Sequence, residues 1–135
     1  MTELEKGYVA GLIDGEGTIT LTKIHSTDKF RAPSVEMTST TYAMLEKIQV
    51  LCGGNISQQK VYKETYKQSW HWQVRYDKAI NLLAEVKDYL LEPKKSYRAN
   101  LIVNEYKNVT PRNGKYNEEK LAAKLDFEER FFKEI

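Results

Sequence analysis

The segment GYVAGLIDGEG, residues 7–17, constrains the fold of this chain more than any other part of its sequence. Its apolar residues recur at helical spacing, and Thr2 and Glu5 just before it are spaced as an N-terminal capping box. A helix is therefore predicted over residues 2–14, even though glycine occurs twice inside it. Because each interior glycine costs roughly 1 kcal/mol relative to alanine, another interaction has to compensate for this loss.

Small residues form a continuous strip along this predicted helix. They occupy positions i, i+3, i+4 and i+7, which lie on one helix face. Such a strip allows a second backbone to approach closely, so a two-fold homodimer would pair this helix with its own copy. Packing within one chain is the alternative for the strip taken alone. Its members are Gly7, Ala10, Gly11 and Asp14.

Two carboxylates, Asp14 and Glu16, follow at the predicted helix end, where the helix dipole disfavours negative charge unless a cation compensates it. Mg²⁺ binds carboxylates and backbone carbonyls, and the flanking Gly15 and Gly17 leave carbonyls accessible. Such metal sites suit phosphoryl transfer, whereas DGEG also occurs as a simple turn. Because the strip and the carboxylates coincide within residues 7–17, we favour the functional interpretation.

The rest of the chain alternates predicted strands and helices, which indicates an α+β fold with four strands. Alternating apolar and polar residues predict a strand after Gly17 and further strands in APSVEMTST, NISQQKVY and SWHWQVRY. The apolar face of the last one is Trp70, Trp72, Val74 and Tyr76. Further helices are predicted in TTYAMLEKIQVLCGG, in KAINLLAEVKDYLL capped by Asp77, in KKSYRANLIVNEYKN, and over residues 117–133.

Length and composition exclude several classes of protein. The 135 residues, 41% of them hydrophobic, fit a single domain over residues 1–135, with a core over 1–108 and a C-terminal loop and helix over 109–135. The single cysteine excludes an internal disulfide, and no segment has membrane length, so we expect no membrane contact and an intracellular location in the cytoplasm or an organelle. The net charge of +2 argues only weakly for a nucleic-acid partner.

The segment VAGLIDGEG, residues 9–17, resembles the LAGLIDADG motif of homing endonucleases and related maturases. Valine replaces the first leucine, Gly15 replaces alanine, and Glu16 stands at the final acid. The segments MTSTTYAMLEKIQVLCGGNI and LLEPKKSYRANLIV also resemble this family, whereas residues beyond Asn108 carry no recognisable motif. The resemblance implies an αββαββα saddle, in which a twisted four-stranded antiparallel sheet lies along the DNA major groove with helices behind it.

The resemblance also implies an activity. A chain with one motif copy would form a homodimer through the motif helix and cut both strands of a long, partly palindromic DNA site, with Mg²⁺ as cofactor, to spread an intron or intein. Glu16 would be the catalytic acid and metal ligand, and the Gly15 carbonyl a second ligand. Lys95 would stabilise developing phosphate charge, and Ser39 would replace a water-positioning residue. Asp14 would belong to the helix end and the dimer interface.

In such a saddle, the polar faces of the strands would read the bases of double-stranded DNA. Side-chain chemistry favours guanine for Arg75, adenine for Gln73 and cytosine for Glu36. The full set of predicted base-contacting residues is Thr20, Thr22, Ser34, Glu36, Asn55, Ser57, Gln59, His71, Gln73 and Arg75.

Two other functions fit the same sequence. A splicing maturase would bind its own intron RNA, and a DNA-binding regulator would use the same scaffold without cleavage. The presence of Glu16 and Lys95 argues against a regulator, because a protein that only binds DNA has no use for acids beside phosphates. Without the resemblance, Lys94 and Lys95 would be solvated charges in the first turn of a helix.

Overall fold

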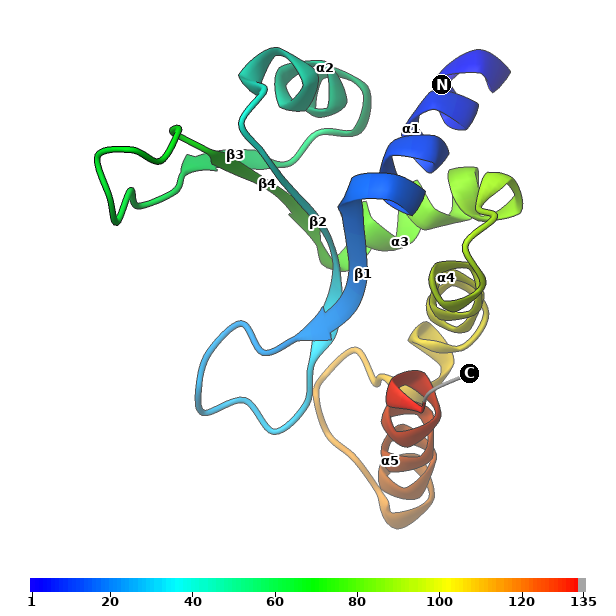
Figure 1. Cartoon of the computed structure of the whole chain (residues 1–135). Helices are drawn as coiled ribbons and strands as arrows, with labels where there is room; N and C mark the ends of the chain where they lie inside the picture. Colours follow the sequence, from blue (N-terminus) through cyan, green and yellow to red (C-terminus); the bar gives the residue numbers. More distant parts are fainter. Residues whose placement is uncertain (134–135) are drawn as a thin grey trace.

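Figure 1 shows the computed structural model of the chain, in which residues 1–133 are described. Helices pack on one face of a four-stranded antiparallel sheet, and the opposite face is left open. The predicted α+β class and the αββαββα order with additional C-terminal helices are confirmed. The elements are α1 (Glu3–Glu16), β1 (Gly17–Thr22), β2 (Ala32–Ser39), α2 (Tyr42–Cys52), β3 (Asn55–Gln58), β4 (Trp70–Arg75), α3 (Tyr76–Val86), η1 (Lys87–Tyr89), α4 (Pro93–Glu105), η2 (Lys107–Val109) and α5 (Glu118–Phe132).

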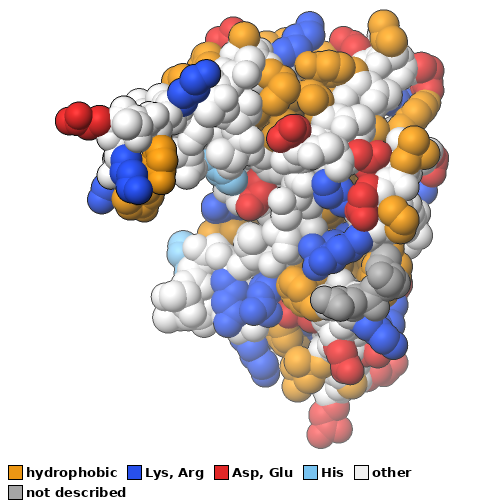
Figure 2. Space-filling view, viewed as in Figure 1, with side chains coloured by type: hydrophobic (Ala, Val, Ile, Leu, Met, Phe, Trp, Pro, Cys, Tyr) orange, Lys and Arg blue, Asp and Glu red, His pale blue; other side chains and the backbone are white. Residues whose placement is uncertain are grey.

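The sheet has the strand order β1-β2-β4-β3, and each neighbouring pair is antiparallel. The alternating sequence pattern predicted which side chains face the core, and Ile19, Val35 and Trp72 on three different strands are buried with at most 1% of their surface exposed. The polar residues between them face the open side. Figure 2 shows this side as a hollow between two projecting lobes, both of which carry lysine or arginine side chains.

The motif helix α1 begins as predicted and ends later. The Thr2 hydroxyl accepts from the Glu5 backbone N–H, and the Glu5 carboxylate accepts from the Thr2 N–H, which completes the capping box. The helix continues to Glu16, and β1 starts at the next residue, Gly17. A Cβ at Gly17 would lie 2.9 Å from the Cα of Ile13, so this abrupt change from helix to strand requires glycine.

Two element boundaries differ from the prediction. β3 ends at Gln58 instead of continuing to Tyr62, because the Gln68 side-chain amide donates to two backbone carbonyls and closes the connecting loop. Tyr76, predicted on the apolar face of β4, begins α3 with a φ of 54° and is half exposed. The predicted cap Asp77 therefore lies in the first turn of α3, where its charge still favours the helix dipole.

The C-terminal helix α5 contributes to the same hydrophobic core as the sheet. Phe127 and Phe131 of α5 are fully buried in the cluster that also contains Ile102 of α4. The Tyr97 hydroxyl of α4 donates to the backbone carbonyl of Arg130, with 2.8 Å between the two oxygens. The last helix is therefore packed against α4.

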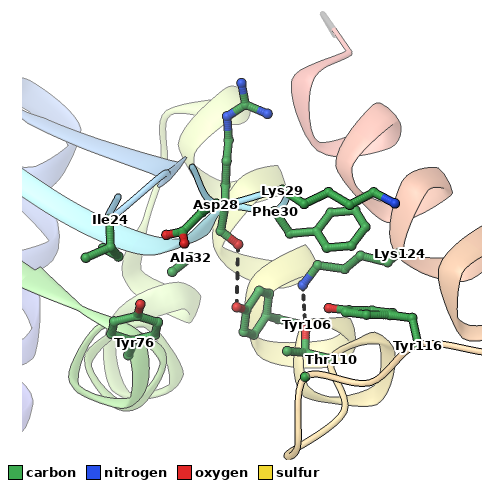
Figure 3. Close-up of a pocket in the computed structure, with 12 residues that line it drawn as sticks. Ile24, Asp28, Lys29, Phe30, Ala32, Tyr76, Tyr106, Thr110, Tyr116 and Lys124 are labelled. Carbon is green, nitrogen blue, oxygen red and sulfur yellow. Dashed lines mark hydrogen bonds between the residues drawn. The ribbon is translucent and has the colours of Figure 1, made fainter. Parts of the chain in front are cut away.

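Lys124 on α5 is a charged residue with no exposed surface. Its ammonium donates to the Thr110 hydroxyl at 2.5 Å and lies 4.0 Å from the centre of the Tyr106 ring, beside a cavity of about 360 Å³ that Phe30 and Tyr116 also line (Figure 3). No ion pair with Lys124 occurs among residues 1–133. Because burial disfavours the charged form, it lowers the pKa of Lys124 to about 8.

We expect Lys124→Met to be at least as stable as the wild type at pH 7 and to lose this advantage at higher pH. The pKa of Lys124 is lower in the folded state than in the unfolded state. The unfolding free energy of the wild type therefore increases as the pH rises from about 8 toward the ordinary lysine pKa. The difference in unfolding free energy between variant and wild type should change by on the order of 3 kcal/mol over this range.

Urea unfolding at pH 7, 8.5 and 10 measures this difference. Lys120→Met is the matched control, since Lys120 is an exposed lysine of the same helix and its loss should give no comparable pH dependence. A stability difference for Lys124→Met that stays constant with pH would contradict the prediction.

Candidate active site and nucleic-acid interface

Glu16 is the last residue of α1, and its carboxylate is exposed. Gly15 before it is also exposed, and among the described residues nothing outside the adjoining helix backbone lies within 4 Å of the position that a Cβ would occupy there. The last carbonyls of a helix lack partners within the helix. The Glu16 carboxylate and the last backbone carbonyls of α1 therefore lie together where α1 joins β1.

Lys95 of α4 lies at this same helix end. Its ammonium donates to the backbone carbonyl of Ile13 at 2.9 Å and to that of Asp14 at 2.6 Å. Its own backbone N–H donates to the carboxylate of Glu92, which caps α4. Lys95 is therefore held against the partially negative end of α1 and is not merely a solvated charge, whereas its neighbour Lys94 is exposed.

Asp14 contributes in another way than Glu16. Its carboxylate accepts from the backbone N–H groups of Leu91 at 2.8 Å and Glu92 at 3.3 Å. Both oxygens thus fasten the segment before α4 to the end of α1. The acid assigned to the helix end occupies that end, and a contact of Asp14 with a second chain stays a prediction.

Ser39 is the last residue of β2. Its hydroxyl accepts from the backbone N–H of Thr41 at 2.9 Å, where the chain turns into α2. Gly17, the residue after Glu16, pairs with Met37, which lies two residues before Ser39 on the same strand. Ser39 therefore lies at the same end of the β1–β2 strand pair as Glu16. A role of Ser39 in positioning water stays a prediction.

Arg98 is a further cation of this region that the sequence analysis did not identify. One turn after Lys95 on α4, it donates to the backbone carbonyl of Ile19 at 2.9 Å, and its guanidinium carbon lies 4.8 Å from the centre of the Phe131 ring. Lys95 and Arg98 thus hold the chain before and after Glu16. The i, i+3 spacing of Lys95 and Arg98 was the sequence pattern that could have identified Arg98. A cavity of about 410 Å³ beside them is lined by Gly17, Thr18, Ile19, Glu92, Lys94, Lys95 and Arg98.

The predicted strip on α1 is only partly at the surface. Gly7 and Gly11 are exposed, and within the described part of the chain nothing outside their own helix backbone lies within 4 Å of the position of a Cβ. Ala10 differs from the prediction, because it has no exposed surface and packs into the core of its own chain. The exposed face instead includes Leu4 and Tyr8, with 84% and 46% of their surface exposed. This face therefore combines two exposed glycines with two large apolar side chains.

The polar side chains of the open sheet face form three rows across the strands, because the strands pair in register. Cross-strand partners point to the same side of a sheet. The rows are Thr20, Ser34 and Arg75; Thr18, Glu36, Gln73 and Asn55; and Thr38, His71 and Ser57.

The edges of this face include two residues missing from the predicted set and two members of that set. Thr18 and Thr38 belong to the rows although the prediction did not include them, and the same alternation would have identified both. Thr22 ends β1, and its hydroxyl oxygen is buried and has no hydrogen-bond partner among residues 1–133. Gln59 follows β3, and its backbone carbonyl accepts from the Gln68 side chain. These positions define the limits of the face.

At the centre of the face, three side chains bond to one another. The Gln73 amide nitrogen donates to the Ser34 hydroxyl and to the Glu36 carboxylate, both at 2.9 Å. The Ser34 hydroxyl donates to the same carboxylate oxygen at 3.1 Å. Ser34 has no exposed surface, so it supports the other two side chains and has no surface for a base. This corrects its assignment as a base-contacting residue.

The open polar sheet and the motif helix that ends in an exposed acid define a single-motif α+β saddle. Residues 9–106 match the model of the LAGLIDADG endonuclease family, and the chain belongs to this family. No curated protein sequence matches the chain. Within the described residues, no helix has both the length and the apolar character needed to cross a membrane.

Solved structures share the fold at low sequence identity. The homing endonuclease I-CvuI in complex with DNA has a TM-score of 0.72 at 18% identity, covering 96% of this chain and 80% of that one. The homing endonuclease I-TnaI has a TM-score of 0.64 at 16% identity, with 98% and 90% covered. The archaeal intron-encoded I-Vdi141I complexed with DNA has a TM-score of 0.61 at 19% identity, with 96% and 82% covered. The likeness extends over nearly the whole chain.

Proposed function

We propose that this protein is a site-specific double-strand DNA endonuclease that acts as a homodimer on a long, partly palindromic site. The main support is the placement of one acid. Glu16 is exposed at the end of the motif helix, beside the cations of α4 and at the margin of an open polar sheet face. The structural neighbours I-CvuI and I-Vdi141I are DNA complexes, which is consistent with this function.

Mg²⁺ fits the donors that this site offers. The Glu16 carboxylate and the Gly15 carbonyl are hard oxygen ligands, as this cation prefers. Among residues 1–133 no group of three or more His, Cys, Asp or Glu could hold a metal ion, so further ligands would come from phosphate, water or a second chain. When bound, the metal would polarise the phosphate and activate water. The I-CvuI complexes were obtained with 2 mM Mg, the DNA not cleaved, and with 2 mM Ca.

The side chains around the acid would prepare the reaction by position and charge. An ammonium has three donors, and Lys95 uses two of them on the carbonyls at the end of α1. Its third N–H would bind a phosphate oxygen, where negative charge develops during hydrolysis. Asp14 and Arg98 would act through the backbone, because they hold the two segments that flank Glu16.

The exposed face of α1 supports the proposed homodimer. The exposed glycines at positions 7 and 11 leave room for another backbone, and Leu4 and Tyr8 would be covered by a partner. Two-fold pairing would bring both copies of Glu16 to the same region, one for each DNA strand.

In vitro cleavage selection from a randomised duplex library with Mg²⁺ tests the function. Recovery of a long, roughly palindromic site with staggered ends would support it, particularly if Ca²⁺ in place of Mg²⁺ allows binding without cutting. Enrichment by binding without cleavage under any divalent ion would favour a regulator. If the protein binds its intron RNA specifically and more tightly than duplex DNA, it is a maturase.

A further inference from the structure

We propose that the cluster of Ser34, Glu36 and Gln73 selects bases that donate a hydrogen bond in the major groove, cytosine or adenine, and disfavours guanine at one position of each half-site. This inference rests on the proposed function. It replaces the expectation that Gln73 reads adenine with both its donor and its acceptor.

The first step is the orientation of the Gln73 amide. A carboxylate only accepts hydrogen bonds, so the group that faces the Glu36 oxygen at 2.9 Å is the amide nitrogen and not the amide oxygen. The same nitrogen donates to the Ser34 hydroxyl, also at 2.9 Å. A side-chain amide has two N–H groups, and we assign one to each of these acceptors, so the amide oxygen is the group turned away from the cluster.

The second step concerns Ser34. Its hydroxyl has one hydrogen, which it donates to the Glu36 carboxylate at 3.1 Å, and it has no exposed surface. What the cluster still presents is therefore the second Glu36 carboxylate oxygen and the Gln73 amide oxygen. Both side chains are partly exposed on the open face, and both groups only accept.

The third step is the complementary chemistry of the bases. Cytosine offers its N4 amino group and adenine its N6 amino group in the major groove, whereas guanine offers two acceptors, N7 and O6. A cluster that only accepts and carries negative charge would pair with the amino groups and repel the acceptor edge of guanine. Arg75 lies two residues along β4, with exposed donors that favour guanine instead.

The exchange Glu36→Gln provides the test. Glutamine keeps the shape and the oxygen that accepts from Gln73, but it adds an outward-facing N–H, so guanine becomes acceptable. Binding selection with Ca²⁺ in place of Mg²⁺, read by sequencing, measures base preference without requiring cleavage. We expect the wild type to favour cytosine or adenine over guanine roughly tenfold at one position per half-site, and Glu36→Gln to abolish this preference there and leave other positions unchanged.

Glu64→Gln in the exposed β3–β4 loop is the matched control, because it removes the same charge outside the face. A second variant, Gln73→Met, removes the hydrogen bond that Gln73 donates to Glu36 and should broaden the base preference at the same position. If wild-type protein enriches a site but neither variant changes any base frequency, or if the wild type prefers guanine there, this inference is overturned while the proposed function stands. If no duplex is enriched at all, the proposed function fails, and the inference with it.

Discussion

Glu16→Gln should bind the target duplex as tightly as the wild type but cleave it at least about a hundredfold more slowly. Mg²⁺ ligation supplies several kcal/mol of charge stabilisation to phosphoryl transfer, and each 1.36 kcal/mol is a factor of ten in rate. Glutamine keeps the size of the side chain and removes the charge that attracts the cation. Because Glu16 is exposed and accepts no hydrogen bond in the described structure, its replacement should not disturb folding.

Single-turnover cleavage with saturating Mg²⁺ and binding with Ca²⁺ measure the two quantities separately. Glu3→Gln is the matched control, because Glu3 is an exposed acid of the same helix, distant in sequence from the α1–β1 junction. Cleavage by Glu16→Gln at the wild-type rate would refute the assignment of this residue. Equal loss of binding and cleavage would instead show that Glu16 serves DNA affinity.

Gly11→Leu should weaken the proposed homodimer and shift it toward monomer. Among residues 1–133, nothing beyond the helix backbone lies within 4 Å of the position of a Cβ at Gly11, so leucine fits in the isolated chain. Leucine also has a higher helix propensity than glycine. In a helix pair that meets at Gly11, the added side chain would overpack the interface by about 1–3 kcal/mol, or more where backbones touch. The dissociation constant should rise by about tenfold to a hundredfold.

Sedimentation velocity over a range of protein concentrations checks this change. Ala43→Leu, an exposed small-to-large substitution on α2, is the control for added apolar surface. A dimer that survives Gly11→Leu with unchanged affinity would place the interface elsewhere on the molecule.

Local patterns in the sequence determined most of the secondary structure. The capping box at Thr2, the glycine that ends α1 at residue 17, and alternation along β1, β2 and β4 depend on neighbours in the chain, so they are visible without tertiary structure. The same reasoning placed Glu16 at a helix end. The motif resemblance added Lys95. Residue spacing within one helix could not predict that Lys95 of α4 lies close to the end of α1.

Other features depended on contacts between residues distant in the chain. The helical spacing of the small residues on α1 was predicted correctly. Only the packing of α1 within the chain decided that Ala10 is buried while Gly11 is exposed. Asp14 meets residue 91, and Lys124 has its charge enclosed by aromatic rings from other segments.

The sequence by itself determined the elements, the polar and apolar faces of the sheet and the family resemblance, because these follow from local periodicity and a contiguous motif. Only the tertiary structure decided which polar groups are already bonded to one another. Ser34 and Gln73 alternate like every other predicted base-contacting residue, but the β2–β4 register brings them together with Glu36, and hydrogen bonding there fixes what the face offers to a base. Donor and acceptor balance depends on three-dimensional neighbours, and residue type alone does not specify it.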